Sequence, residues 1–427
     1  MFKDNPIIVK LLIVIFVLLG LNGFLFFKSI DLNNRINEGG ENNPTVEEEE
    51  EEIDNPILIN SKDGFDINIF KQIVNTSKGD NKVISPLSIK IAMTMASEGA
   101  SQGTLEEIYQ SIGLNQESKI EIKKLIESIS NQDEIIFEIA NSTWARQGLD
   151  FKADFKNTLE DYYISEAKVL DFTNPSSKDV INSWVKNKTN NKIDSIIDTI
   201  SPNDIMYLIN AIYFNADWKE QFKKEFTIEQ DFNLSNGSKI KVDMMNRSMD
   251  DFSYQENADF QAVELPYGEN GRFVMRVYLP NEKTDIKDFV SDITIEKHNS
   301  WKKNFAIKEG SLSLPKFKSE YSESLKEALI SIGVIDAFDS QKANFERMID
   351  ISNANVYISD VKHKTYIDVS EKGTEAAAVT AVIMQTTSMP TEKERFEMVV
   401  DRPFFFTIDD TEQDLIIFMG VIEKPEY

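Results

Sequence analysis

The chain has 427 residues, of which 41% are hydrophobic and 10% aromatic, so it can bury one large core or two smaller ones and is too apolar to be disordered. Its formal net charge of −26 argues against nucleic-acid binding, which needs clustered Lys and Arg side chains. The sequence contains no cysteine, which excludes disulfides, thiol nucleophiles and thiolate metal sites.

Residues 1–28 resemble a membrane segment. An apolar stretch from Leu11 to Phe27 follows Lys3 and Lys10, and it is just long enough to cross a hydrocarbon core of roughly 30 Å as a helix. No small-residue cleavage site follows it, because Phe26, Phe27 and Lys28 have the wrong chemistry. We expect an uncleaved signal-anchor that holds the body outside the cytoplasm, with a cleaved signal peptide and an interfacial helix as the alternatives.

Residues 29–59 have the composition of a linker. They combine Asn, Gly and Pro44 with an unbroken run from Glu47 to Glu52, which repels itself and cannot offset the entropy of folding. The pattern becomes globular from Asn60 and stays so to Tyr427, without a second linker or an internal repeat. We therefore expect one folded domain over residues 60–427.

Helical patterns come first in this domain and strands dominate later. Residues from Phe65 to Ile73 place their apolar side chains on one face, and Ser88 to Ala96 begins a second helix after a turn. The run from Met206 to Phe214 is almost continuously apolar and of strand length, as expected for a strand covered on both faces. Asn210 lies in its middle, and a buried amide left unpaired there would cost roughly 1–3 kcal/mol.

The segment from Val361 to Val369 alternates between apolar and polar residues, which predicts a half-buried strand. His363 falls on its apolar face. It is one of two histidines in the chain, and no serine or carboxylate motif flanks it as in a nucleophilic enzyme. We therefore expect His363 and Asn210 to belong to a buried hydrogen-bond network with a structural rather than a catalytic role.

An unusual segment follows Gly373 and runs from Thr374 to Ser388. Read with a period of two, one set of its residues is small or apolar throughout and could enter a sheet without burying a charge: Thr374, Ala376, Ala378, Thr380, Val382 and Met384. Glu375 falls in the other set. Composition alone leaves open an ordinary core strand or helix end, but an uncharged segment able to pair as a strand is otherwise an aggregation hazard.

The residues Glu371, Lys372, Gly373, Thr374, Glu375, Ala376, Ala377 and Ala378 resemble the hinge of the reactive-centre loop of inhibitory serpins. Further stretches resemble serpin motifs in family order: Asn81 to Ser88, Asn210 to Phe214, Leu265 to Tyr267, Leu314 to Phe317, Asp401 to Phe406 and Phe418 to Gly420. The resemblance implies an α+β fold with three β-sheets, eight or nine helices and an exposed loop. It also implies a suicide-substrate inhibitor whose cleaved loop enters the largest sheet.

The resemblance assigns roles to individual residues. It implies a polar cluster beneath the opening sheet, here called the shutter, and a site where insertion begins, here called the breach. The shutter comprises Ser85, Ser88, Asn210 and His363, and the breach comprises Trp218 and Lys316, the latter paired with Glu371. Gly373 is the implied pivot and Thr374 the first residue to insert.

Family spacing places the reactive bond between Thr387 and Ser388, although Met384, Met389 and the cluster from Glu392 to Arg395 remain alternatives. A small β-branched residue at the bond favours an elastase-like or subtilisin-like serine peptidase as the target, with a cysteine peptidase as a further possibility. We expect a monomer without a metal or cofactor.

Two other functions compete with inhibition. Some serpins act as carriers, chaperones or structural surface proteins, and their hinges typically carry bulky or charged residues in the inserting set, unlike this one. A membrane-tethered hydrolase with paired carboxylates is the second rival. The 72 acidic residues provide many chance pairs, but none lies near a diagnostic motif.

Overall fold

The computed structural model describes residues 64–115, 117–130, 135–349, 356–374 and 395–427. The expected membrane segment and acidic linker lie outside these ranges. Within them, no helix combines the length and apolar character needed to cross a bilayer.

Nine α-helices lie in the described ranges: α2 (Phe65–Thr76), α3 (Pro86–Gly99), α4 (Gln102–Ile112), α5 (Ser118–Ser130), α6 (Ala153–Tyr163), α7 (Ser177–Lys188), α8 (Ile286–Asp292), α9 (Ile295–Lys302) and α10 (Lys326–Ser331). Short 3-10 turns are η2 (Lys224–Phe226) and η3 (Asp336–Phe338). Helix α3 is buried along its whole length. It begins at Pro86 because Ser85 Oγ accepts the backbone N–H of Ser88, which satisfies one of the unpaired donors of the first turn.

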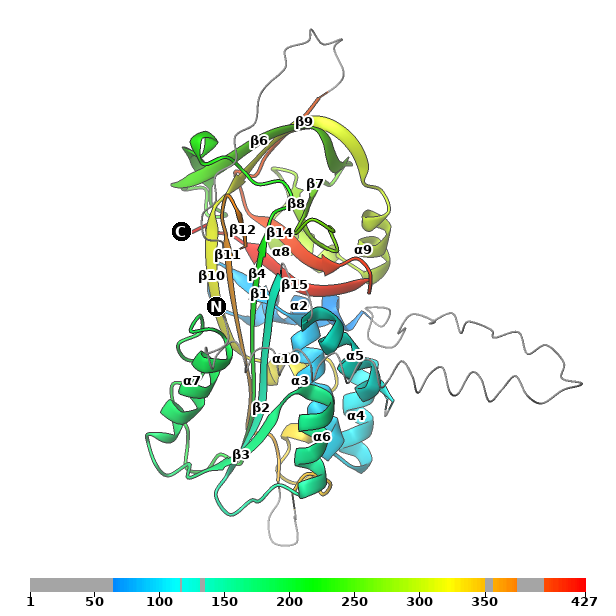
Figure 1. The fold of residues 1–427 in the computed structure, drawn as a ribbon, viewed down its shortest axis with the longest axis vertical. Coiled ribbons are helices and arrows are strands. Elements are labelled where there is room, and N and C mark those ends of the chain that lie inside the picture. The colour runs from blue at the N-terminus through cyan, green and yellow to red at the C-terminus, as the bar shows by residue number, and fades with distance from the viewer. Residues whose placement is uncertain (1–63, 116, 131–134, 350–355, 375–394) are drawn as a thin grey trace, which may run out of the picture. The chain divides into compact units, whose positions relative to one another are not determined.

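A six-stranded sheet contains, in spatial order, β10 (Phe317–Ser324), β11 (Asp360–Val369), β12 (Gly373–Thr374), β4 (Met206–Asp217), β2 (Ile135–Arg146) and β3 (Glu166–Leu170). Figure 1 shows α7 on one side of this sheet and α3 to α6 on the other. Strand β4 is therefore covered on both faces, which explains its nearly continuous apolar sequence.

The remaining strands form a nine-stranded set: β1 (Lys82–Ile84), β15 (Leu415–Ile422), β14 (Phe404–Asp410), β8 (Phe273–Pro280), β7 (Phe260–Pro266), β6 (Lys239–Glu256), β9 (Ala306–Pro315) and β13 (Phe396–Val399), with β5 (Ile228–Asn233) paired to β6. Strand β6 passes through an irregularity between Met249 and Phe252. The two sheets expected beside the large one are thus joined into one hydrogen-bonded set, because one long bent strand belongs to both. The expected α+β class is confirmed.

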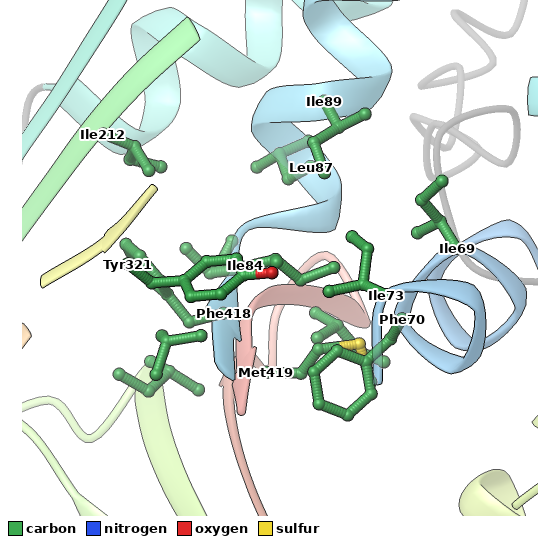
Figure 2. Close-up of a cluster of buried hydrophobic side chains, with 14 of the residues drawn as sticks. Ile69, Phe70, Ile73, Ile84, Leu87, Ile89, Ile212, Tyr321, Phe418 and Met419 are labelled. Atoms are coloured by element: carbon green, nitrogen blue, oxygen red, sulfur yellow. The ribbon is translucent and has the colours of Figure 1, made fainter. Parts of the chain in front are cut away.

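The main core lies between the two sheets and the helices around α3. Figure 2 shows part of it, with side chains from α2, β1, α3, β4, β10 and β15 packed together. A second, smaller core covers the opposite face of the six-stranded sheet beneath α7, where Trp144, Ile181 and Ile209 are buried. Burial on both faces fixes the register of β4, because a slip by one residue would turn the side chains that face one core towards the other.

Candidate functional site

The six-stranded sheet contains a seam between β11 and β4. These strands pair directly and in parallel, with Asp360 to Tyr366 in register with Tyr207 to Tyr213. At the end of the seam the two-residue strand β12 lies between them and is antiparallel to both, because Thr374 pairs with Ala216 on β4 and with Val369 on β11. The seam is thus closed along its length and occupied by the hinge at one end.

The structure brings the four predicted shutter residues together beneath this seam. All four are fully buried. His363 Nδ1 donates to Asn210 Oδ1, and the Asn210 amide donates to the Ser88 carbonyl oxygen at 3.0 Å. The backbone N–H of Ser85 donates to His363 Nε2 at 3.2 Å. A hydrogen-bonded chain therefore crosses the seam from β4 to β11 and continues to the start of α3.

The partners of His363 explain its charge state. Its Nδ1 faces an amide oxygen and its Nε2 faces a backbone N–H, so the neutral imidazole satisfies both contacts. A second ring proton would point at another donor. Burial away from water lowers the pKa of His363 to about 3. The ring is therefore neutral near pH 7 and suits a structural role.

The network contains one member that the sequence did not indicate. Asn141 on β2 accepts the Asn210 amide through its Oδ1. Close by, Thr365 Oγ1 donates to the Val83 carbonyl oxygen at 2.7 Å and ties β11 to β1. Asn141 is brought to Asn210 only by the antiparallel pairing of β2 with β4, which no local pattern encodes.

The breach residue Trp218 lies directly beside the hinge. Its indole N–H donates to the Ser370 carbonyl oxygen at 2.9 Å, and its backbone N–H donates to the Lys372 carbonyl oxygen at 2.7 Å. The indole stacks on Tyr267 with ring centroids 4.4 Å apart. Trp218 therefore fixes the turn that connects β11 to β12.

The predicted ion pair at the breach is formed, with Lys316 Nζ 3.2 Å from a Glu371 carboxylate oxygen and both side chains 12% exposed. Thr227 Oγ1 also donates to Glu371, at 2.9 Å. Burial alone raises the pKa of Glu371, but backbone and Thr227 hydrogen bonds together with Lys316 hold it below its ordinary value. The C-terminal ring of Tyr427 lies 3.9 Å from Lys316 Nζ, a contact that the sequence did not predict.

Close approach explains the glycine at position 373. A Cβ atom there would lie 2.2 Å from the Ala216 carbonyl oxygen and 2.6 Å from the Asp217 Cα, so any other residue would displace β12 from β4. Thr374 follows and is fully buried, with its hydroxyl 2.8 Å from the Tyr267 hydroxyl. Gly373 and Thr374 therefore form the first two residues of a strand that is already hydrogen-bonded within the sheet.

The other predicted loop residues lie outside the described ranges: Glu375, Ala376, Ala377, Ala378, Thr387 and Ser388. Across the part of the chain that the structure describes, no group of three or more His, Asp or Glu side chains could hold a metal ion.

Comparisons with known proteins agree with this geometry. The family model described as Serpin (serine protease inhibitor) matches residues 60–425. An uncharacterised serpin-like protein of Methanosarcina acetivorans is 34% identical over 379 residues, covering 86% of this chain and 88% of its own length. Serpin B8 of Homo sapiens is 31% identical over 370 residues, covering 84% of this chain and 97% of its own.

A solved structure of the thermophilic serpin tengpin in its native state superposes with a TM-score of 0.79 at 32% identity. The match covers 90% of this chain and 96% of tengpin. The expected fold is confirmed by these similarities, and the chain belongs to the serpin family.

Proposed function

We propose that this chain is a suicide-substrate inhibitor of serine endopeptidases, in which the cleaved loop inserts into the seam between β11 and β4. The observation that carries the proposal is the placement of β12. Thr374 already pairs with both flanking strands and Gly373 pairs with β4, antiparallel to each, as an inserting strand would be. Adding a strand to such a sheet satisfies backbone groups on both sides and buries apolar side chains.

The register of β12 predicts where later loop residues would come to lie. Thr374 pairs with Ala216 on β4 and with Val369 on β11, and both pairings are antiparallel. If the inserted strand keeps this register, the residue six positions after Thr374 lies opposite Asn210 on β4 and opposite His363 on β11. Thr380 would therefore enter between the two shutter side chains, on the same face as Thr374. Its hydroxyl can donate to one and accept from the other, which would replace the hydrogen bond that insertion breaks.

The rest of the inserting set suits burial. Ala376, Ala378, Val382 and Met384 carry no charge, so their entry would strand no ionised group between the sheet and α3. The direct pairing of β11 with β4 must break first, and the shutter hydrogen bonds span that seam. The shutter would thus set the barrier, while strand addition would supply the driving force.

Finer features belong to the same proposal. The reactive bond lies between Thr387 and Ser388, and its small side chains fit an elastase-like or subtilisin-like peptidase. Residues 1–28 would anchor the protein to a membrane with the inhibitor domain on the extracytoplasmic side, or direct its secretion if they are cleaved.

The proposal is tested by mixing the full chain with elastase-like, subtilisin-like and papain-like peptidases and separating the products under denaturing conditions. We expect an adduct with a serine peptidase that survives denaturation, together with a C-terminal fragment whose mass places its first residue at Ser388. Thr374→Arg serves as the matched control, since a charge on the first inserting position should give cleavage without adduct.

Two results would oppose the proposal. Loop cleavage without an adduct by every peptidase would argue against inhibition, and an unchanged heat stability of the cleaved protein would also exclude insertion. A fragment that begins elsewhere would correct only the reactive bond.

A further inference from the structure

Arg247 on β6 has an unusual environment for a positive charge. Its guanidinium carbon lies 4.7 Å from the ring centroid of Phe222 and 5.1 Å from that of Phe252, so the group is held between two aromatic rings. One of its N–H groups donates to the Glu220 carbonyl oxygen, while Nε is shielded from solvent and has no hydrogen-bond partner among the described residues. Burial lowers the pKa of Arg247 to about 10, although Glu220 and Asp251 favour its charged form.

One of the two rings reaches the start of the reactive loop. The backbone N–H of Phe222 donates to the Glu371 carbonyl oxygen at 2.8 Å, and its ring meets that of Trp218 edge-on at 6.4 Å. Trp218 in turn holds the turn before Gly373 through the hydrogen bonds described above. Phe222 therefore connects Arg247 to the hinge.

The other ring reaches the point where the chain returns to the sheet after the loop. Phe252 meets Phe396, the first residue of β13, with ring centroids 5.5 Å apart. Phe396 also stacks on Tyr254 at 3.8 Å and lies against Gly310, where a Cβ atom would come within 2.3 Å of the ring. Tight packing of Phe396 anchors β13 to β9.

We propose that Arg247 is a positioning residue that joins the hinge to strand β13 and keeps both ends of the uncleaved loop in place. This inference rests on the proposed inhibitory function. An uncleaved loop is fixed at both ends, so it can enter the seam along its whole length only if β13 leaves β9. Because the Arg247 cation contacts both Phe222 and Phe252, movement of the hinge or of β13 would weaken one of its two cation–π contacts. The position of each end of the loop therefore affects the other.

The inference predicts a selective effect of Arg247→Met, which keeps the length of the side chain and removes its charge and N–H groups. Hydrogen exchange of the uncleaved protein should accelerate about tenfold at the amides of Phe396 to Val399 and at Gly373 and Thr374, as expected when one cation–π contact is lost. Spontaneous loss of inhibitory capacity on incubation should accelerate by a similar factor. Arg247→Lys should restore only part of the protection, because an ammonium keeps the charge but lacks the broad guanidinium group that contacts both rings.

Arg146→Met is the matched control. Arg146 also donates one hydrogen bond to a backbone carbonyl, that of Pro202 at 3.4 Å, but it lies at the far end of β2 and touches neither end of the loop. A general loss of stability in Arg247→Met would accelerate exchange throughout the sheets, whereas the inference predicts acceleration confined to β13 and the hinge, with none at these amides in Arg146→Met.

Unchanged exchange at β13 in Arg247→Met, or faster exchange at β13 without faster exchange at the hinge, would overturn the inference. If Arg247→Met does not fold, hydrogen exchange of Arg247→Lys at the same amides tests the inference, which predicts faster exchange than in the unaltered chain at both β13 and the hinge. Hydrogen exchange uses no peptidase, so failure of the coupling can be distinguished from failure of the inhibitory function, which the adduct assay on the unaltered chain reports.

Discussion

Acid should weaken the folded protein through its buried histidines, and His363 provides the clearest case. The pKa of His363 is about 3 in the folded chain because burial opposes its charge, whereas an imidazole in an unfolded chain has a pKa of about 6.5. The unfolded state therefore binds a proton as the pH falls below 6.5, while the folded state does not. The contribution is fully present above pH 6.5 and is lost as the pH falls towards 3.

The size of the effect follows from these two values. At pH 5 the solution lies about 1.5 pH units below the unfolded pKa, and each unit is worth about 1.4 kcal/mol, so His363 should lower the free energy of unfolding by about 2 kcal/mol relative to pH 7.5. Burial also lowers the pKa of His298, to about 4, which adds a loss of about the same size. We expect about 4 kcal/mol for the unaltered chain and about 2 kcal/mol for His363→Gln.

The assay is denaturant unfolding at the two pH values, supported by NMR of the imidazole nitrogens. With only two histidines, the spectrum contains two ring systems, and His298→Gln assigns them. His363 should remain neutral at pH 5 with its proton on Nδ1. Titration of His363 near pH 6.5, or an equal pH dependence in His363→Gln and the unaltered chain, would refute the argument.

Further predictions concern the seam and the hinge. Thr374→Arg should be cleaved by the target peptidase and form no adduct, because the side chain at this position is fully buried; an adduct on a denaturing gel would contradict insertion. Gly373→Ala should expel β12 from β4, seen as faster hydrogen exchange at Thr374, and unchanged exchange would show that the close approach is not limiting. Asn210→Ala should destabilise the closed seam by about 1–3 kcal/mol, because the His363 N–H loses its acceptor; an unchanged melting temperature and no added polymer after heating would oppose this.

Local patterns predicted much of the seam. Alternation along Val361 to Val369 placed His363 on the buried face, and the apolar run around Asn210 indicated a strand covered on both sides. Both features depend on short-range periodicity, because successive side chains of a strand point to opposite faces of the sheet. The structure pairs these residues in register, as a shared network requires.

Other features depend on contacts between distant parts of the chain. Asn141 reaches Asn210, and the ring of Tyr427 reaches Lys316, through pairings that no local signal specifies. The joining of the two smaller sheets depends on β6, whose sequence contains no Gly or Pro to mark its bend. Arg247 likewise gave no signal, because its significance comes from two rings at different positions in the chain.

Opening of the seam is the central claim, and a removable crosslink tests it most directly. Ala211 and Lys364 are register partners across the seam, and neighbouring strands lie about 4.8 Å apart, within the range that a disulfide spans. The chain contains no other cysteine, so Ala211→Cys with Lys364→Cys introduces a single pair of thiols. Peptidase should cleave the oxidised protein without forming an adduct, and reduction should restore the adduct. Equal adduct formation in the oxidised and reduced proteins would contradict insertion between β11 and β4.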